Sequence, residues 1–141
     1  MIYLVTNQQS MFNSVGYSLA SIEESLEYLN TLDIIGFDTE TMGMDPYNCQ
    51  LLSMQLGDND KQYVIDCTTV DPSEYKEILE KKELIMHNAK FDLRFLYYQG
   101  IMPCKVYDSF LMERVLHTGL DTVRKSLDAV TYKYCKIELD K

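Results

Sequence analysis

The sequence predicts an α/β protein with a mixed sheet, in which three antiparallel strands are followed by alternating strands and helices. Strand-like runs at 33–41, 51–56 and 62–66 follow one another, and turn residues at 57–60 join the last two as a hairpin. Short apolar runs then alternate with helical patterns, which is typical of a mixed sheet covered by helices. These runs lie at 84–86 and 104–108, and the helical patterns at 91–99, 109–117 and 122–135.

The N-terminal part of the chain supplies a further strand and a further helix. Residues 1–6 have the composition of a strand, and 7–21 form a polar connection. Apolar residues recur at helical spacing in 22–29, and Ser21 with Glu24 three residues later is a capping box.

Two other helices are marked by local signals. One opens at Asp71 and runs to about Lys82, with Pro72 in its first turn, where proline is tolerated. The last helix has one apolar stripe along its length. That stripe comprises Val123, Leu127, Val130 and Tyr134.

Length and composition limit the classes of protein that fit. The 141 residues suit one domain, 1–141, with its own core. No apolar run could span a membrane and no signal peptide is present, so we expect a cytoplasmic protein without a membrane partner. We expect reduced thiols, because the four cysteines are too far apart for a metal knuckle. The net charge of −9 argues against a nucleic-acid coat protein, which should be basic.

The strand at 33–41 carries the first candidate for chemistry. Side chains alternate along a strand, so Asp38 and Glu40 point to the same face. Two neighbouring carboxylates that are mostly buried repel each other unless a cation lies between them, and their hard oxygen atoms suit magnesium or manganese. The alternative is that these acids only begin a solvated turn.

A second candidate lies about fifty residues later, where residues 86–92 lead from a buried strand into a helix. Asp92 falls in the first turn of this helix, where the helix dipole favours a carboxylate, so simple capping would explain it. However, ligands in open α/β sheets gather at the carboxyl ends of strands, where this helix begins.

Taken together, the two segments resemble a known family. Residues 37–41 (Phe-Asp-Thr-Glu-Thr) and 87–92 (His-Asn-Ala-Lys-Phe-Asp) are similar to the first two motifs of the DEDD 3′–5′ exonuclease superfamily. The resemblance is greatest to the proofreading domain of family A DNA polymerases and to RNase D, and it extends over about residues 31 to 141. It implies an RNase H-like fold.

The resemblance also implies a mechanism and a role for each residue. Two Mg²⁺ or Mn²⁺ ions would hydrolyse the terminal phosphodiester, one by activating the attacking water and the other by stabilising the leaving oxygen. Asp38 would bridge both ions, Glu40 would bind one ion and hold the water, and Asp92 would hold the second. Four further residues would contact the last nucleotides, with the side chain of Met44 wedged against the terminal base. These substrate-binding residues are Thr39, Met44, Asn88 and Phe91.

The sequence departs from the family at the third motif, Tyr-x-x-x-Asp or His-x-x-x-x-Asp, which supplies the fourth carboxylate. Neither form follows Asp92, so we expect the fourth carboxylate beyond Lys141 and a domain cut short at its C-terminus. Two weak substitutes occur: His117 with Asp121, which is one residue short, and Tyr134 with Glu138 in place of Asp.

Several other residues have two interpretations. Asp108 resembles a residue that supports the site and could equally cap the next helix, and His87 could be a locally hydrogen-bonded strand-end residue. Among the tyrosines, Tyr47 is the best candidate for stacking on a base. Scattered basic residues could meet phosphates or could merely be solvated, namely Lys90, Arg94, Arg114 and Lys125.

The first functional hypothesis is therefore a metal-dependent 3′–5′ exonuclease domain of the proofreading type. Its expected partners are the 3′ end of single-stranded DNA, with RNA as an alternative, and the polymerase portion of a longer chain. The other hypotheses are a non-catalytic nucleic-acid-binding or structural module of a polymerase and RNase D-like trimming of RNA.

Overall fold

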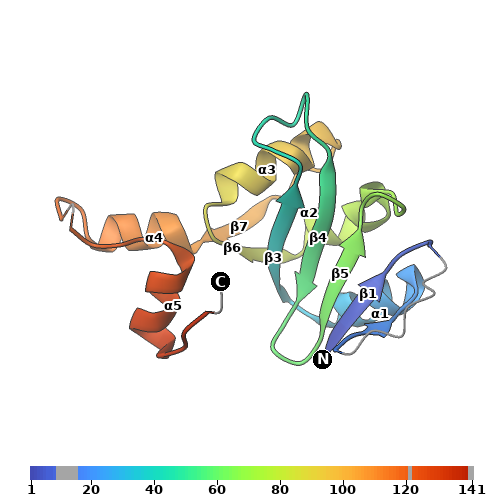
Figure 1. Ribbon diagram of the computed structural model, residues 1–141, viewed down its shortest axis with the longest axis horizontal. Coiled ribbons are helices and arrows are strands. Elements are labelled where there is room, and N and C mark those ends of the chain that lie inside the picture. Colours follow the sequence, from blue (N-terminus) through green and yellow to red (C-terminus); the bar gives the residue numbers. More distant parts are fainter. Residues whose placement is uncertain (9–15, 121, 140–141) are drawn as a thin grey trace.

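The computed structural model describes residues 1–8, 16–120 and 122–139, and it confirms the α/β class and the mixed sheet (Figure 1). Its seven strands lie in the order β2-β1-β5-β4-β3-β6-β7. The β3–β4 and β4–β5 pairs are antiparallel, as expected, and all other pairs are parallel. The strands are β1 (Ile2–Val5), β2 (Ser18–Leu19), β3 (Ile34–Thr41), β4 (Leu51–Gly57), β5 (Gln62–Asp66), β6 (Glu83–Met86) and β7 (Lys105–Asp108).

The helices lie close to where the sequence predicts them, with two corrections. The helix expected from Asp71 to Lys82 is a 3-10 turn, η1 (Pro72–Tyr75), followed by α2 (Lys76–Lys81). The last helix, α5 (Leu127–Cys135), begins five residues later than predicted. The remaining helices are α1 (Ile22–Thr31), α3 (Ala89–Tyr98) and α4 (Ser109–Leu116). No helix among the described residues is long and apolar enough to cross a membrane.

Two local features at the N-terminal end can be compared with the prediction. The capping box of α1 is present, because the Ser21 hydroxyl accepts the amide of Glu24 and the Glu24 carboxylate accepts the amide of Ser21. The polar connection contains the short strand β2, which the sequence pattern does not reveal because its two residues are both exposed. Residues 9–15 of that connection lie outside the described residues.

The hydrophobic core lies on one face of the sheet and determines which way the side chains of β3 point. Ile35, Phe37 and Thr39 of β3 are buried, and the first two share the core with Phe95 and Leu96 of α3. The alternating residues of β3 point to the opposite, open face. One strand therefore presents a buried side towards α3 and an accessible side that carries Asp38 and Glu40.

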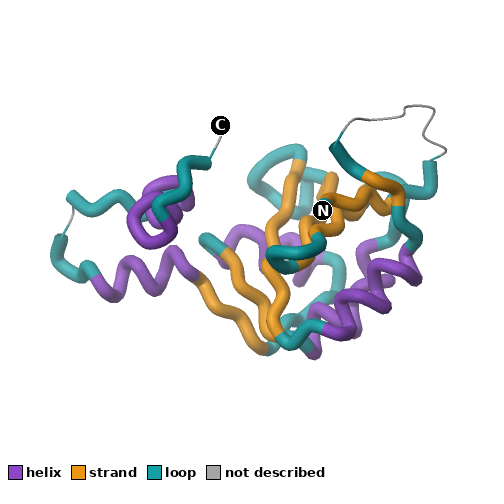
Figure 2. Tube along the Cα trace, turned by 90° about the horizontal axis from the view of Figure 1, so that it is seen from below, coloured by secondary structure: helices purple, strands orange, loops and turns teal. Residues whose placement is uncertain are grey.

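Helices α4 and α5 form an arm that stands apart from the sheet (Figures 1 and 2), here called the α4–α5 arm. Glu113 of α4 is only 2% exposed and holds the arm together. Its carboxylate accepts hydrogen bonds from the Lys133 ammonium at 2.7 Å and from the Tyr134 hydroxyl at 2.8 Å, and His117 lies 3.3 Å from it. The hydrogen bond from Lys133 holds the pKa of Glu113 below its usual value.

The apolar stripe predicted for the last helix is wrong. Val123 precedes α5, none of the residues of α5 is fully buried, and Tyr134 uses its hydroxyl on Glu113 instead of packing its ring in the core. The spacing of apolar residues along a helix does not tell whether they pack in the core. Here one of them, Tyr134, instead binds a single buried carboxylate.

We expect Glu113→Ala to loosen the α4–α5 arm and to leave the sheet intact, because it removes the only buried acceptor of Lys133 and Tyr134 among the described residues. Amide hydrogens of α5 should exchange at least about tenfold faster, measured by hydrogen exchange with mass spectrometry. Exchange in β3 and β4 should not change. The matched control is Glu138→Ala, an exposed carboxylate whose loss should leave α5 protected.

The four cysteines are free thiols, as the sequence predicts. Cys49 and Cys67 are partly buried, and burial raises the pKa of Cys67 to about 12, which keeps this thiol protonated and unreactive.

Candidate active site

Asp38 and Glu40 project from the same, open face of β3, as the strand period requires. Partial burial raises the pKa of Asp38, and the neighbouring charge of Glu40 raises it further, whereas the Thr39 amide and His87 lower it. The protein thus holds this carboxylate where its negative charge is unfavourable.

Asp92 lies in the first turn of α3 and is only 3% exposed. Its Oδ1 atom accepts a 2.6 Å hydrogen bond from the Thr39 hydroxyl, which points to the buried side of β3. Burial raises the pKa of Asp92 to about 6, with a further contribution from the charge of Asp38, and the hydrogen bond from Thr39 opposes both effects. The helix dipole and capping would explain an exposed carboxylate at this position. They do not explain why the carboxylate of Asp92 is buried.

Through its charge, Glu40 raises the pKa of Asp38, and Asp38 in turn raises the pKa of Asp92. Within the described residues, no three His, Cys, Asp or Glu side chains form a group that could hold a metal ion. Asp92 reaches β3 from the side of α3, through Thr39, while Asp38 lies on the open side. The three-carboxylate site remains a prediction.

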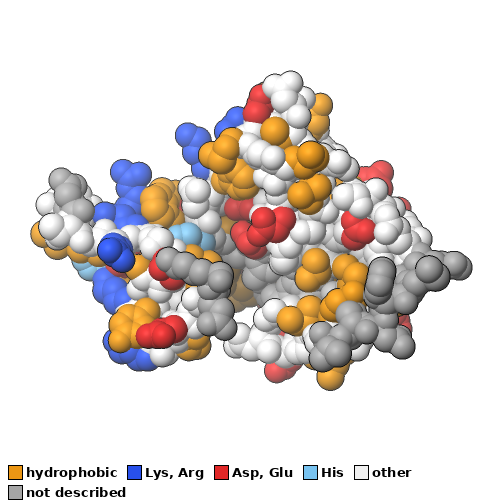
Figure 3. All heavy atoms as spheres, viewed as in Figure 1, with side chains coloured by type: hydrophobic (Ala, Val, Ile, Leu, Met, Phe, Trp, Pro, Cys, Tyr) orange, Lys and Arg blue, Asp and Glu red, His pale blue; other side chains and the backbone are white. Residues whose placement is uncertain are grey.

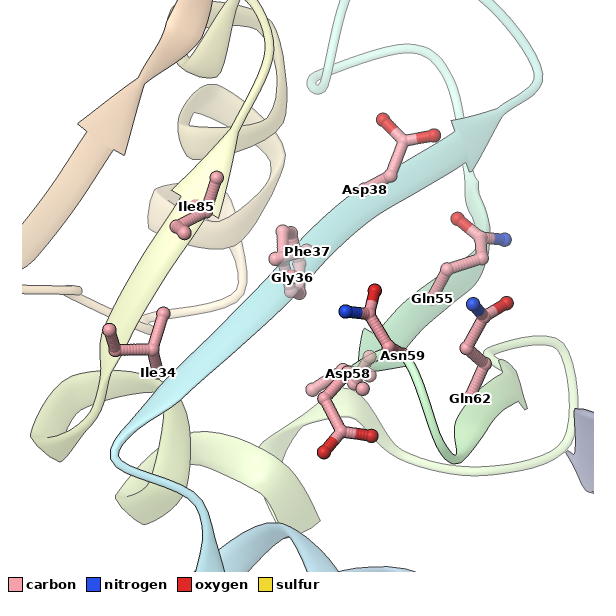
Figure 4. A pocket seen from close by; sticks show the side chains of 11 residues that line it. Ile34, Gly36, Phe37, Asp38, Gln55, Asp58, Asn59, Gln62 and Ile85 are labelled. Carbon is pink, nitrogen blue, oxygen red and sulfur yellow. The ribbon is translucent and has the colours of Figure 1, made fainter. Parts of the chain in front are cut away.

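A hollow of about 550 Å³ lies on the open side of β3 and includes Asp38 in its wall (Figure 4). Ile34 and Ile85 line one side of it, and Gln55 and Gln62 line the other. Acidic side chains also gather at the centre of the space-filling view (Figure 3). The face that carries Asp38 is thus concave and open to a ligand.

The turn that leads into α3 is fixed by Asp108 at the end of β7. Its carboxylate accepts the backbone amides of Asn88 and Ala89 at 3.0 and 2.9 Å, and it also caps α4 by accepting the amide of Phe110 at 2.9 Å. The capping interpretation of Asp108 is therefore confirmed, and the same carboxylate holds the start of α3, while its support of a catalytic site stays a prediction. Asn88 has a left-handed backbone, with φ of 64°, and the two bonds from Asp108 stabilise this conformation.

His87 is held by local hydrogen bonds, as its interpretation as a strand-end residue expects. Its Nδ1 atom lies 2.9 Å from the hydroxyl of Ser109, which itself donates to the carbonyl of Met86. From this position the ring also lowers the pKa of Asp38.

The residues predicted to contact substrate lie in different environments. Met44 is 73% exposed, and Asn88 is also exposed. Phe91 is half-buried, with its ring centroid 5.4 Å from that of Phe95. The Thr39 side chain is buried and already bonded to Asp92, so it orients that carboxylate. Their contacts with substrate remain predictions.

No contact of the described residues brings either weak substitute for the third motif to Asp38, Glu40 or Asp92. The hydroxyl of Tyr134 is bonded to Glu113, and the His117 ring lies beside Glu113 and Lys133. Glu138 is exposed, and Asp121 lies outside the described residues. Sequence reasoning missed Glu113 itself, because a single acid in an apolar helix has no distinctive spacing.

The sequence of residues 17–141 matches the model of a family described as 3′–5′ exonuclease. The chain belongs to this family. It is also 27% identical over 121 residues to DNA polymerase I of Aquifex aeolicus, a match that covers 85% of this chain. The chain spans about a fifth of the length of that relative.

Solved structures of the DEDD exonuclease superfamily share the fold, which confirms the RNase H-like architecture. Brucella melitensis NrnC with bound Mg²⁺ matches 99% of this chain and 64% of its own, with a TM-score of 0.70 and 22% identity. Escherichia coli RNase D, an exoribonuclease involved in structured RNA processing, matches 84% of this chain and 32% of its own, with a TM-score of 0.69 and 24% identity.

Proposed function

We propose that this 3′–5′ exonuclease domain removes nucleotides from the 3′ end of a single strand by hydrolysis, with Asp38, Glu40 and Asp92 as its catalytic and metal-binding carboxylates. The observation that carries the proposal is the 2.6 Å hydrogen bond that ties Asp92 of α3 to Thr39, the residue between Asp38 and Glu40 on β3. The pKa values of Asp38 and Asp92 are both raised. Such unfavourable carboxylates are concentrated at functional sites. The segments that carry them resemble the family's first two motifs.

The donor atoms suit Mg²⁺ or Mn²⁺, which prefer carboxylate oxygens. A cation beside Asp38 would offset both its partial burial and the charge of Glu40, the two effects that raise its pKa. A divalent ion bound there would polarise the phosphoryl oxygen and stabilise the leaving group. The family's fourth carboxylate would complete the two-ion set.

The chain's own residues then have distinct tasks. Thr39 keeps the Asp92 carboxylate oriented towards β3, and Asp108 fixes the turn from which α3 starts. Met44 and Phe91 offer apolar contact to the terminal nucleotide, and Glu40 holds a water for attack on the phosphorus.

Single-stranded DNA is the substrate that we favour, in keeping with the polymerase I relative, and the polymerase portion of a longer chain is the expected partner. RNA is the second candidate, because RNase D shares the fold and NrnC has been solved bound to pGG.

The test compares DNA and RNA strands of one sequence, each labelled at its 5′ end, with a chain that carries residues 1–141 and a Tyr-x-x-x-Asp third motif. We expect stepwise shortening from the 3′ end, abolition by a chelator, and a loss of at least about a thousandfold in Asp38→Ala. Asp60→Ala removes an equal charge in an exposed turn and should keep full activity. Digestion from the 5′ end, or unchanged activity of Asp38→Ala, would contradict the proposal.

A further inference from the structure

A second hollow, of about 360 Å³, lies between the β3–β4 loop and α3. It is lined almost entirely by aromatic rings and one guanidinium group. Three of its tyrosines are exposed: Tyr47 by 76%, Tyr98 by 55% and Tyr97 by 46%. The lining residues, here called the tyrosine patch, are Pro46, Tyr47, Arg94, Tyr97 and Tyr98.

The tyrosine patch belongs to the same two segments that carry the candidate carboxylates. Tyr47 lies in the loop that follows Glu40, and Arg94 lies two residues after Asp92 in α3. In α3, Asp92 and Phe95 face inward, whereas Arg94, Tyr97 and Tyr98 are accessible from the hollow. The patch and the carboxylates are thus carried by the same strand–loop segment and the same helix, on different faces of α3.

The patch is preformed. The Asp45 carboxylate accepts the backbone amide of Tyr47 at 3.1 Å, and its carbonyl accepts the amide of Cys49 at 2.8 Å, so the loop is held by its own turn. The rings of Tyr47 and Tyr98 meet edge to face, with centroids 5.4 Å apart. Their outer faces are not needed by the core and remain available for stacking.

Arg94 supplies the only formal positive charge in the patch. It forms no salt bridge with any carboxylate in the described part of the chain, although its charge contributes to lowering the pKa of Asp45. In the space-filling view, hydrophobic side chains, a class that includes tyrosine, lie beside Lys and Arg side chains at the top, over the β3–β4 loop and α3 (Figure 3). An acidic side chain lies among them at the very top, and more acidic side chains lie at the centre. Although the protein has a net charge of −9, the guanidinium of Arg94 gives this part of the surface a cation that can bind a phosphate.

We propose that the tyrosine patch binds the single strand on the 5′ side of the nucleotide being removed, with bases stacked on Tyr47 and Tyr98 and a phosphate at Arg94. Aromatic rings combined with a cation bind single-stranded nucleic acid with little sequence preference, because every base has a face to stack. A strand whose 3′ end lies among the carboxylates has only its 5′ portion left to extend outward. This inference rests on the proposed exonuclease function and deepens it.

The test measures binding of 5′-labelled oligothymidylates, from about two to about ten nucleotides, to residues 1–141 by fluorescence anisotropy in buffer with calcium. Wild-type affinity should rise with length until the patch is covered and should then level off. Tyr47→Ala and Tyr98→Ala should each weaken the longer strands by roughly tenfold and leave the dinucleotide unchanged. Tyr98→Phe keeps the ring and should bind like wild type.

Arg94→Gln should lower the slope of log affinity against log salt by about 0.7, the value for one phosphate contact to a single strand. Tyr132→Ala is the matched control, because Tyr132 is 55% exposed, like Tyr98, but lies on α5.

Three outcomes decide the matter. A loss of length-dependent affinity confined to the patch variants supports the inference. Wild-type binding with the same length dependence in Tyr47→Ala, Tyr98→Ala and Arg94→Gln overturns the patch and leaves the proposed function standing, and would favour a protein partner for these tyrosines. Absence of binding at every length overturns the patch, whereas the proposed function is decided separately by the digestion assay of the chain that carries the third motif.

Discussion

Residues 1–141 alone should remove 3′ nucleotides at least about a hundredfold more slowly than an extended chain that carries Tyr-x-x-x-Asp. The reason is geometric. The family's two-ion set needs a fourth carboxylate, and residues 93–141 contain neither form of the third motif that would supply it. In-line attack tolerates little misplacement of the water or the phosphate, and about 1 Å of error can cost a hundredfold.

The measurement is the rate of shortening of a labelled single strand with magnesium or manganese at equal concentrations of the two chains. Asp38→Ala in both chains defines the background. Rapid, chelator-sensitive digestion by residues 1–141, abolished by Asp38→Ala, would show that the fourth carboxylate is already present. Glu138 and Asp121, the acids of the two weak substitutes, would then be the residues to replace next.

Much of the fold can be predicted because its signals are local. The alternation of β3, the turn between β4 and β5, and the capping box at Ser21 are each contained in a few neighbouring residues, and each is present in the structure. The elements that were missed lack such a signal. Strand β2 has two exposed residues that pair with β1, and nothing in its own composition requires that pairing.

In the candidate site, too, the features set by local sequence could be predicted, and those set by packing between distant segments could not. The shared face of Asp38 and Glu40 follows from the strand period, and the position of Asp92 follows from the start of a helix. The bond from Thr39 to Asp92 joins residues 53 positions apart, and it depends on how closely α3 packs against β3. Its setting, a buried acid with a pKa of about 6, could not be predicted from spacing.

The second large effect concerns stability and Asp92. We expect Asp92→Asn to raise the free energy of unfolding by about 1–3 kcal/mol at neutral pH in a chelating buffer, measured by urea denaturation. Burial raises the pKa of this acid from 3.8 to about 6, and a tenfold change in a protonation equilibrium corresponds to about 1.4 kcal/mol. Asparagine is uncharged and can still accept the hydroxyl of Thr39 at its oxygen.

The pH dependence distinguishes this explanation from a general effect of the substitution. A folded-state pKa above the unfolded one means that Asp92 contributes most to stability below about pH 4, where it is protonated in both states. That contribution is lost as the pH rises from about 4 to about 6 and stays lost above it. The advantage of Asp92→Asn should therefore be small at pH 4, grow through this window and then level off. The matched control is Asp60→Asn, which replaces an exposed acid in the β4–β5 turn by the same change of side chain.

Divalent metal should reverse the order of the two proteins. If Asp38 and Asp92 share a cation, saturating manganese stabilises the wild type by its binding free energy, and the asparagine variant, which has lost a ligand, gains less. The same urea titrations with and without manganese measure this difference. Because the charge of Asp38 already raises the pKa of Asp92 in the folded chain, a cation between the two acids relieves repulsion that the variant no longer has. Equal stabilisation of both proteins by manganese would show that Asp92 is a buried structural acid and not a metal ligand.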